Sequence, residues 1–155
     1  MKTLVLGLGN PILSDDGVGP RVAKELEGSL DQREVTVVET SLAGLSLLDL
    51  LTGYDKAIIV DAIQTVGGKP GQIYRLDPEA FNATLHTASP HDVNFATALE
   101  LGSKLGLPLP RQIDIFAIEV EDVTTFNEEC TSEVECAIPV CVEVIRKELQ
   151  GDHNA

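Results

Sequence analysis

The chain has 155 residues, an apolar content of 43% and a formal charge of −14, from 25 acidic and 11 basic residues. A domain of this length buries roughly 70% of the surface that its unfolded chain exposes, so it needs no disulfides to hold a core. The negative charge disfavours nucleic acid and anionic membranes as partners and favours basic or metal-bearing ones, although solubility alone also explains it.

Signals for strands and helices alternate along the chain. Short β-branched and apolar runs predict strands at residues 3–8, 35–39, 56–61, 72–75 and 112–120, the fourth as an antiparallel edge strand. Apolar stripes with helical spacing predict helices that begin near Pro20 and end near Gly28, then at 45–53, 89–105 and 132–149, with a weakly patterned loop that contains some helix at 77–88. The alternation predicts an α/β three-layer sandwich: a mainly parallel, twisted central sheet of about five strands with helices on both faces.

Domain organisation and location follow from simple features. We expect residues 1–150 to form one domain and residues 151–155 to form a flexible tail. The absence of a signal peptide and of an apolar run near 18 residues predicts a cytoplasmic protein with no membrane partner. The three cysteines, Cys130, Cys136 and Cys141, are odd in number and form no C-x-x-C, so we expect reduced, structural thiols.

The glycine-rich turn after the first strand carries the strongest chemical signal. Gly7-x-Gly9 resembles a dinucleotide fingerprint, but Ile12 stands where the third glycine is needed. Asp15 and Asp16 follow, where they would repel a pyrophosphate. A metal or another cationic group therefore suits this turn better than a phosphate. Only one of the two acids can face a cleft; we predict Asp16, with Asp15 capping the helix or facing solvent.

Three side chains are predicted to meet at the carboxyl edge of the sheet, where such folds bind ligands. Asp16 follows the first strand, Asp61 ends the third, and His91 opens the helix at 89–105. Two carboxylates and an imidazole form a three-ligand site with open positions for a divalent metal. The helix N-terminus disfavours a proton on His91, whereas the carboxylates favour one. Each residue also has a simpler interpretation, as a helix cap, a turn residue or an exposed histidine.

The order and spacing of several motifs resemble those of the nickel–iron hydrogenase maturation endopeptidases. The motifs are Gly7-x-Gly9-Asn10, Asp16-Gly17-x-Gly19, residues 58–62, Ser89-Pro90-His91, and the late segment with Phe126, residues 132–134 and residues 137–139. Together they cover nearly the whole chain. One departure is Val120, where many members have proline after a Gly-Ile pair, and it puts the substrate preference in doubt.

The resemblance implies a specific activity. Such enzymes remove the C-terminal extension of the hydrogenase large-subunit precursor after nickel insertion, and their metal-contacting positions match Asp16, Asp61 and His91. The nickel is presented by the precursor, and another divalent metal is able to occupy the site. We expect a monomer whose partner is that precursor. The same three residues would carry a metal-assisted hydrolysis of the peptide bond.

Other classes of function fit the sequence less well. The chain has neither the G-x-S-x-G elbow of serine hydrolases nor the H-E-x-x-H of zinc proteases. The opening Gly7-Leu8-Gly9-Asn10-Pro11 also occurs in peptidyl-tRNA hydrolases, but the residues that should follow are absent and the acidic charge disfavours tRNA. A non-enzymatic nickel carrier or scaffold for hydrogenase assembly is the main alternative.

Overall fold

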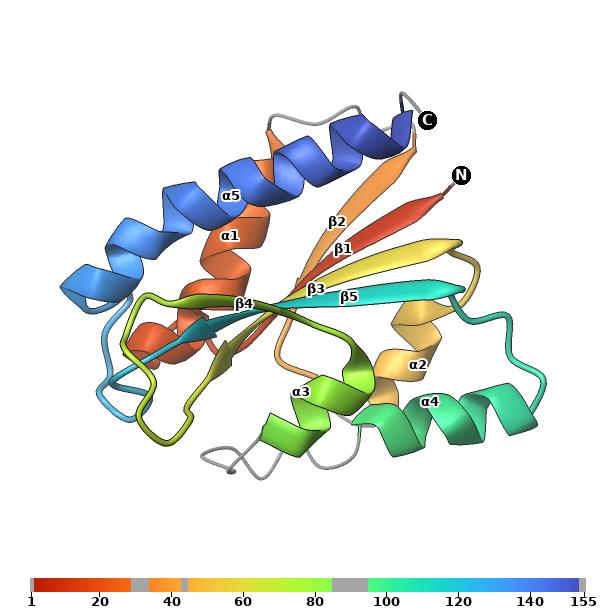
Figure 1. Ribbon diagram of the computed structural model, residues 1–155, viewed down its shortest axis with the longest axis horizontal. Helices are drawn as coiled ribbons and strands as arrows, with labels where there is room; N and C mark the ends of the chain where they lie inside the picture. Colours follow the sequence, from red (N-terminus) through yellow and green to blue (C-terminus); the bar gives the residue numbers. More distant parts are fainter. Residues whose placement is uncertain (1, 29–33, 43–44, 85–94, 154–155) are drawn as a thin grey trace.

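The computed structural model has a five-stranded sheet with helices on both faces, and it describes residues 2–28, 34–42, 45–84 and 95–153 (Figure 1). The strands lie in the order β2-β1-β3-β5-β4. Strands β2 (Val35–Thr40), β1 (Thr3–Leu8), β3 (Lys56–Ile63) and β5 (Gln112–Glu119) are mutually parallel, and β4 (Ile73–Leu76) is an antiparallel edge strand. The predicted sandwich and the predicted edge strand are confirmed.

The central strands are apolar because both of their faces are covered. Every residue of β1 and β3 is buried. In β3, Ile58 and Val60 belong to one core cluster, whereas Ile59 and Ile63 belong to the other. This alternation follows from the two-residue period of a strand and fixes the face on which each polar side chain of β3 lies.

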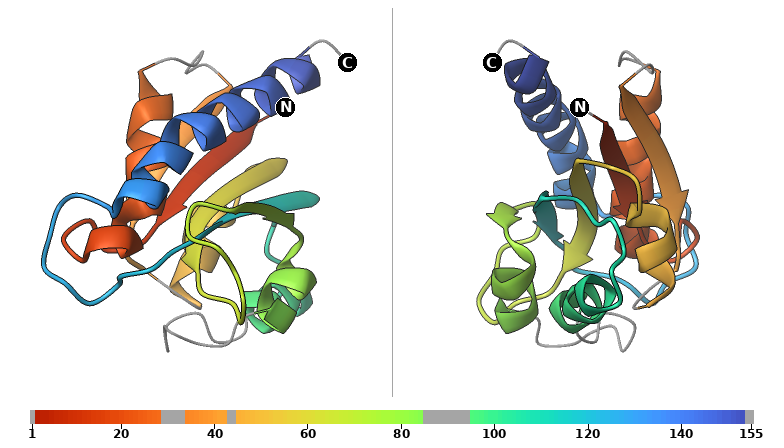
Figure 2. Two further views of the ribbon diagram at one scale, coloured as in Figure 1. Left: turned by 60° about the vertical axis from the view of Figure 1, so that its left-hand side comes forward. Right: turned by 90° about the vertical axis from the view of Figure 1, so that its right-hand side faces the viewer.

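The helices are divided between the two faces (Figure 2). Helices α1 (Val18–Glu27) and α5 (Ser132–His153) cover one face, which we call the α5 face. Helices α2 (Ser46–Leu51), α3 (Pro78–Thr84) and α4 (Phe95–Lys104) cover the other, which we call the α4 face. Helix α3 lies in the predicted weakly patterned loop, and α5 extends beyond the predicted end at Leu149.

Ion pairs fix α5 against the rest of the molecule at both ends. Near its start, Glu135 accepts two hydrogen bonds from the Arg21 guanidinium of α1, at 2.8 and 3.1 Å. Near its end, Glu148 accepts hydrogen bonds from the buried Lys56 ammonium and from the Arg75 guanidinium. The long helix is therefore tied to α1, β3 and β4 by side chains as well as by its apolar stripe.

Within the described ranges, no helix combines the length and the apolar character needed to cross a membrane.

Candidate functional site

The turn after β1 delivers Asp16 to the carboxyl edge of the sheet. Gly9 has φ of +144°, and a side chain there would overlap the carbonyl group of Asp16, so only glycine fits. The chain then forms η1 (Ser14–Gly17), a short 3-10 helix that leads into α1. The half-buried Asp16 carboxylate accepts a hydrogen bond from the Asn10 backbone N–H at 2.9 Å. This bond fixes the carboxylate beside the glycine turn.

Asp61 lies near the end of β3, but not at its last residue. The strand continues to Ile63, so the prediction that Asp61 ends the strand is wrong, because the apolar Ala62 and Ile63 extend the pairing with β5. The Asp61 side chain is 5% exposed, and its Oδ1 atom accepts the Ala62 N–H at 2.8 Å. By strand alternation, Asp61 lies on the α4 face with Ile59 and Ile63.

Close packing between the first turn of α1 and the two central strands sets where Asp16 and Asp61 lie. A Cβ atom on Gly19 would overlap the carbonyl oxygens of both Leu8 and Val60. The start of α1 therefore rests on the ends of β1 and β3. Because Asp16 lies two residues before α1 and Asp61 follows Val60, both acids lie at the carboxyl edge, as the sequence predicts.

The third predicted ligand, His91, falls in the segment 85–94, outside the described residues. The elements on either side, α3 and α4, both pack on the α4 face through Phe81 and Phe95, and Asp61 lies on that same face. Within the described residues alone, no group of three or more His, Cys, Asp or Glu side chains is arranged to hold a metal. The metal site thus stays a prediction that depends on His91.

Asp15 has a structural role that differs from the prediction of an exposed or helix-capping acid. Its side chain is fully buried. It accepts hydrogen bonds from the backbone N–H groups of Glu121 and Asp122, both at 3.0 Å, and of Thr131 at 2.6 Å. The Thr131 hydroxyl donates a further bond at 2.8 Å. Asp15 therefore closes the loop between β5 and α5 onto η1, which holds the neighbouring Asp16 in position.

Glu119 is a buried acid that the sequence analysis missed. It is 3% exposed at the end of β5, on the same face of the sheet as Asp61. It accepts hydrogen bonds from the Thr65 N–H at 2.8 Å, the Thr65 hydroxyl at 2.5 Å and the Tyr74 hydroxyl at 3.0 Å. A signal was present, since this glutamate interrupts the apolar run that ends at Val120, much as Asp61 interrupts the run in β3.

The two buried cysteines, Cys130 and Cys141, lack the properties of an activated nucleophile. Burial raises the pKa of the Cys141 thiol to about 12, and burial followed by the charges of Asp15 and Glu135 raises the pKa of the Cys130 thiol to about 11. Both are therefore protonated near neutral pH, which makes them poor nucleophiles. Cys136 is exposed on α5, so the prediction that all three thiols are packed is wrong for this one.

Comparison with known proteins assigns the chain to a family. The sequence model of the hydrogenase maturation protease family, HycI, matches residues 20–148. The chain belongs to the hydrogenase maturation protease family. This agrees with the resemblance of the acid-bearing strand and of the late segment, which lie inside the matched residues, and it makes the chain a member of a family of proteases.

Individual family members support the same assignment. The chain is 34% identical to the hydrogenase 2 maturation protease of Escherichia coli over 101 residues, which are 64% of this chain and 62% of that protein. It is 26% identical to the hydrogenase expression/formation protein HupD of Rhizobium leguminosarum over 153 residues, 97% of this chain and 75% of HupD. The aligned part thus spans under two thirds of the first relative and three quarters of the second.

Solved structures of maturation proteases share the architecture of this chain. The E. coli hydrogenase maturating endopeptidase HybD superposes with a TM-score of 0.85 and 28% identity, covering 98% of this chain and 94% of HybD. The maturation protease HycI from Thermococcus kodakarensis superposes with a TM-score of 0.73 and 22% identity, covering 96% of this chain and 92% of HycI. This similarity shows a common fold.

Proposed function

We propose that this maturation protease is an endopeptidase that removes the C-terminal extension of a nickel–iron hydrogenase large-subunit precursor after nickel has been inserted. The observation that carries the proposal is the position of Asp16 and Asp61 at one edge of the sheet in a chain that belongs to this protease family. The relatives are named as hydrogenase maturation proteases, which supports the class of substrate.

In this proposal, Asp16, Asp61 and His91 contact the nickel that the precursor carries. Carboxylate oxygens and an imidazole nitrogen are suitable donors for such a metal, and three protein ligands leave coordination positions for groups of the substrate. The nickel is part of the substrate and supplies the positive charge that two neighbouring carboxylates attract. A carboxylate at this edge is also a suitable acceptor for the proton of an attacking water. Another divalent metal is expected to bind the same donors.

The buried position of Asp61 favours this chemistry. Because its side chain is enclosed on the α4 face, water screens its charge weakly, and its attraction for a cation is stronger than at an exposed position. Asp16 is fixed from the other strand by the Asn10 N–H. The two acids are thus held by the backbone before a substrate arrives, and little ordering is needed on binding.

The experiment incubates the purified chain with nickel-loaded large-subunit precursor and measures the product mass. We expect one cut near the precursor's C-terminus by the wild type and none by Asp16→Asn or Asp61→Asn, with folding of each variant checked by circular dichroism. A carrier or scaffold would bind the nickel-loaded precursor and leave its mass unchanged, which would contradict the proposal.

We further propose that the enzyme acts as a cytoplasmic monomer, without nucleic-acid or membrane partners.

A further inference from the structure

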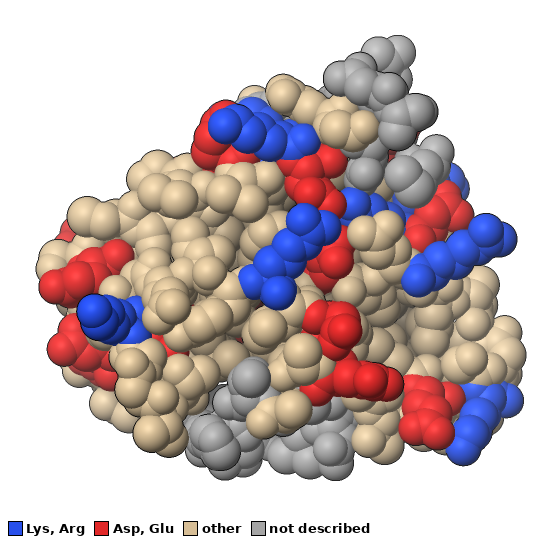
Figure 3. All heavy atoms as spheres, viewed as in Figure 1, with Lys and Arg blue, Asp and Glu red and all other residues tan. Residues whose placement is uncertain are grey.

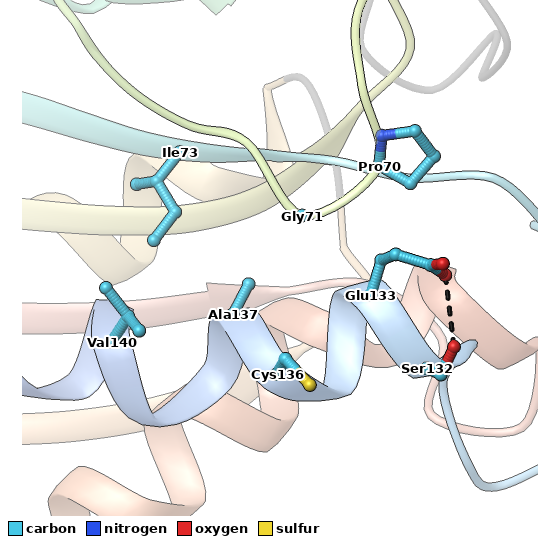
Figure 4. A pocket seen from close by; sticks show the side chains of 8 residues that line it. All are labelled: Pro70, Gly71, Ile73, Ser132, Glu133, Cys136, Ala137 and Val140. Carbon is cyan, nitrogen blue, oxygen red and sulfur yellow. Dashed lines mark hydrogen bonds between the residues drawn. The ribbon is translucent and has the colours of Figure 1, made fainter.

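A groove of about 460 Å³ lies between the first half of α5 and the chain around the start of β4 (Figure 4). Pro70, Gly71 and Ile73 line the side toward the sheet, and Ala137 and Val140 line the helix side. The loop meets the helix closely at Gly71, since a Cβ atom there would lie 2.7 Å from the Glu133 carbonyl oxygen. The groove is therefore narrow at this point, and most of the residues that line it are apolar.

The helix that borders this groove has two apolar stripes. One is buried in the core and consists of Val134, Ile138, Cys141, Ile145 and Leu149. The other comprises Cys136, Val140 and Val144, spaced four residues apart on the outer surface, where Val140 is 55% exposed and Val144 is 42% exposed. A helix packed on a sheet needs only one apolar stripe, so the second, beside an apolar groove, is typical of a binding surface.

Charges around the groove indicate what kind of partner fits it. Figure 3 shows a surface without charged side chains along the middle of α5, with acidic groups near the helix start. Glu133 lines the groove, and Glu128 and Glu129 are exposed just before α5, against one base, Lys69, next to Pro70. A second copy of this chain, with its charge of −14, would bring like charges together. A partner with basic flanks is favoured instead.

We propose that this groove, with the outer stripe of α5, docks an apolar segment with basic flanks on the hydrogenase large-subunit precursor. The inference rests on the proposed function, because that function names the precursor as the partner. The groove lies on the α5 face, since Ile73 and Ala137 pack against that core cluster, whereas Asp61 lies on the α4 face. The docking surface is therefore separate from the acids that act on the substrate.

The loop at residues 64–72 links the docking groove to the candidate site. It follows β3, which carries Asp61, and it supplies Pro70 and Gly71 to the groove. Glu119 holds the same loop through Thr65. A precursor seated in the groove is thus held by a segment anchored to the strands of the site. Docking is expected to strengthen binding of the whole precursor without changing the bond-breaking step, so it should act on KM and not on kcat.

The test compares Val140→Asp with Leu105→Asp in the full chain, using nickel-loaded precursor as substrate. Leu105 is 67% exposed and follows α4 on the opposite side of the sheet, so it is a matched control. We expect Val140→Asp to raise KM about tenfold or more with kcat unchanged, and Val140→Thr to raise it less, because threonine keeps the shape but adds a hydroxyl. Leu105→Asp should behave as wild type. An unchanged KM in Val140→Asp would overturn the proposal.

Direct binding separates failure of this inference from failure of the proposed function. If the wild type cuts no precursor, the endopeptidase proposal fails, and the affinity of the uncut precursor still tests docking: a tenfold loss in Val140→Asp alone supports it, and equal affinities overturn it. Sedimentation velocity tests whether a second copy of this chain occupies the groove instead. A wild-type dimer that Val140→Asp dissociates would assign the groove to a second copy and overturn the proposal, whereas a wild-type monomer agrees with it.

Discussion

At the scale of single residues, two adjacent carboxylates in η1 have different environments. Asp15 is fully buried and accepts hydrogen bonds from three backbone N–H groups of the loop between β5 and α5. Asp16 is half-buried at the sheet edge and accepts one from Asn10. Asp15 therefore supports the structure, whereas Asp16 is left accessible for the substrate contact proposed above.

This assignment predicts opposite effects of two substitutions. Asp15→Ala should lower the free energy of unfolding by at least about 3 kcal/mol, because each buried donor left without an acceptor costs about 1–3 kcal/mol. Asp16→Ala should abolish precursor cleavage and lower stability far less. Urea denaturation and a cleavage assay measure the two effects. Equal destabilisation by both substitutions, or full activity of Asp16→Ala, would contradict the assignment.

The difference between the two acids was only partly predictable. Asp16 was assigned from its place after a strand and from the family resemblance. Asp15 was misassigned because its partners, Glu121, Asp122 and Thr131, lie 106 to 116 residues further along the chain. Local pattern carries no information about such contacts. The S-x-x-E pattern of Ser132 and Glu135 is typical of a capping box, but the Glu135 carboxylate instead accepts the Cys130 N–H at 3.0 Å.

At the scale of elements, Glu119 ties the loop 64–72 to β5. Glu119→Ala should lower the free energy of unfolding by roughly 2–4 kcal/mol, since the Thr65 N–H, the Thr65 hydroxyl and the Tyr74 hydroxyl lose their common acceptor. Tyr74→Phe removes one of these bonds and should cost about 1 kcal/mol. Thermal and urea unfolding compare the two variants, and an equal cost would show that the three bonds do not act together.

The contact between α1 and α5 predicts a pH dependence of stability. Hydrogen bonding to Arg21, opposed by partial burial, lowers the Glu135 pKa from its ordinary value of 4.5. A carboxyl whose folded pKa is depressed stabilises the fold above its unfolded pKa, and this contribution is lost as pH falls through the folded value. Stability should therefore decline below about pH 4.5.

Glu135→Gln tests this pH dependence of stability, with Glu143→Gln as the matched control. It should flatten the decline in unfolding free energy below pH 4.5, whereas Glu143→Gln, which breaks the more exposed pair with Arg146 on α5, should leave the decline nearly unchanged. Urea titrations at a series of pH values provide the comparison. If the unfolding free energy of Glu135→Gln still declined as steeply below pH 4.5, the pH dependence would have to come from other groups.

Most elements were predictable because their signals are local. The apolar runs of β1 and β3 indicate strands covered on both faces, and the structure confirms both. The short α3 was not defined, because its stabilisation comes from Phe81 packing in a distant core cluster and not from an apolar stripe of its own. The end of β3 was placed too early, since a carboxylate was taken to stop a strand that instead buries it.

At the scale of the whole molecule, the fold separates two surfaces. Asp16 and Asp61 lie at the carboxyl edge, with Asp61 on the α4 face, whereas the apolar groove lies on the α5 face. The chain as a whole has a formal net charge of −14. The molecule thus has two carboxylates at one edge of the sheet and an apolar surface on another face, which agrees with the proposed substrate, a metal-loaded polypeptide.

The central claim is that nickel carried by the precursor directs cleavage through these carboxylates. The most direct measurement follows cleavage of two preparations of one precursor by metal-free protease: one nickel-loaded, the other metal-free. We predict a single cut in the nickel-loaded precursor, lost in Asp61→Asn, and no cut in the metal-free one. Cleavage of both preparations at the same rate would contradict the account.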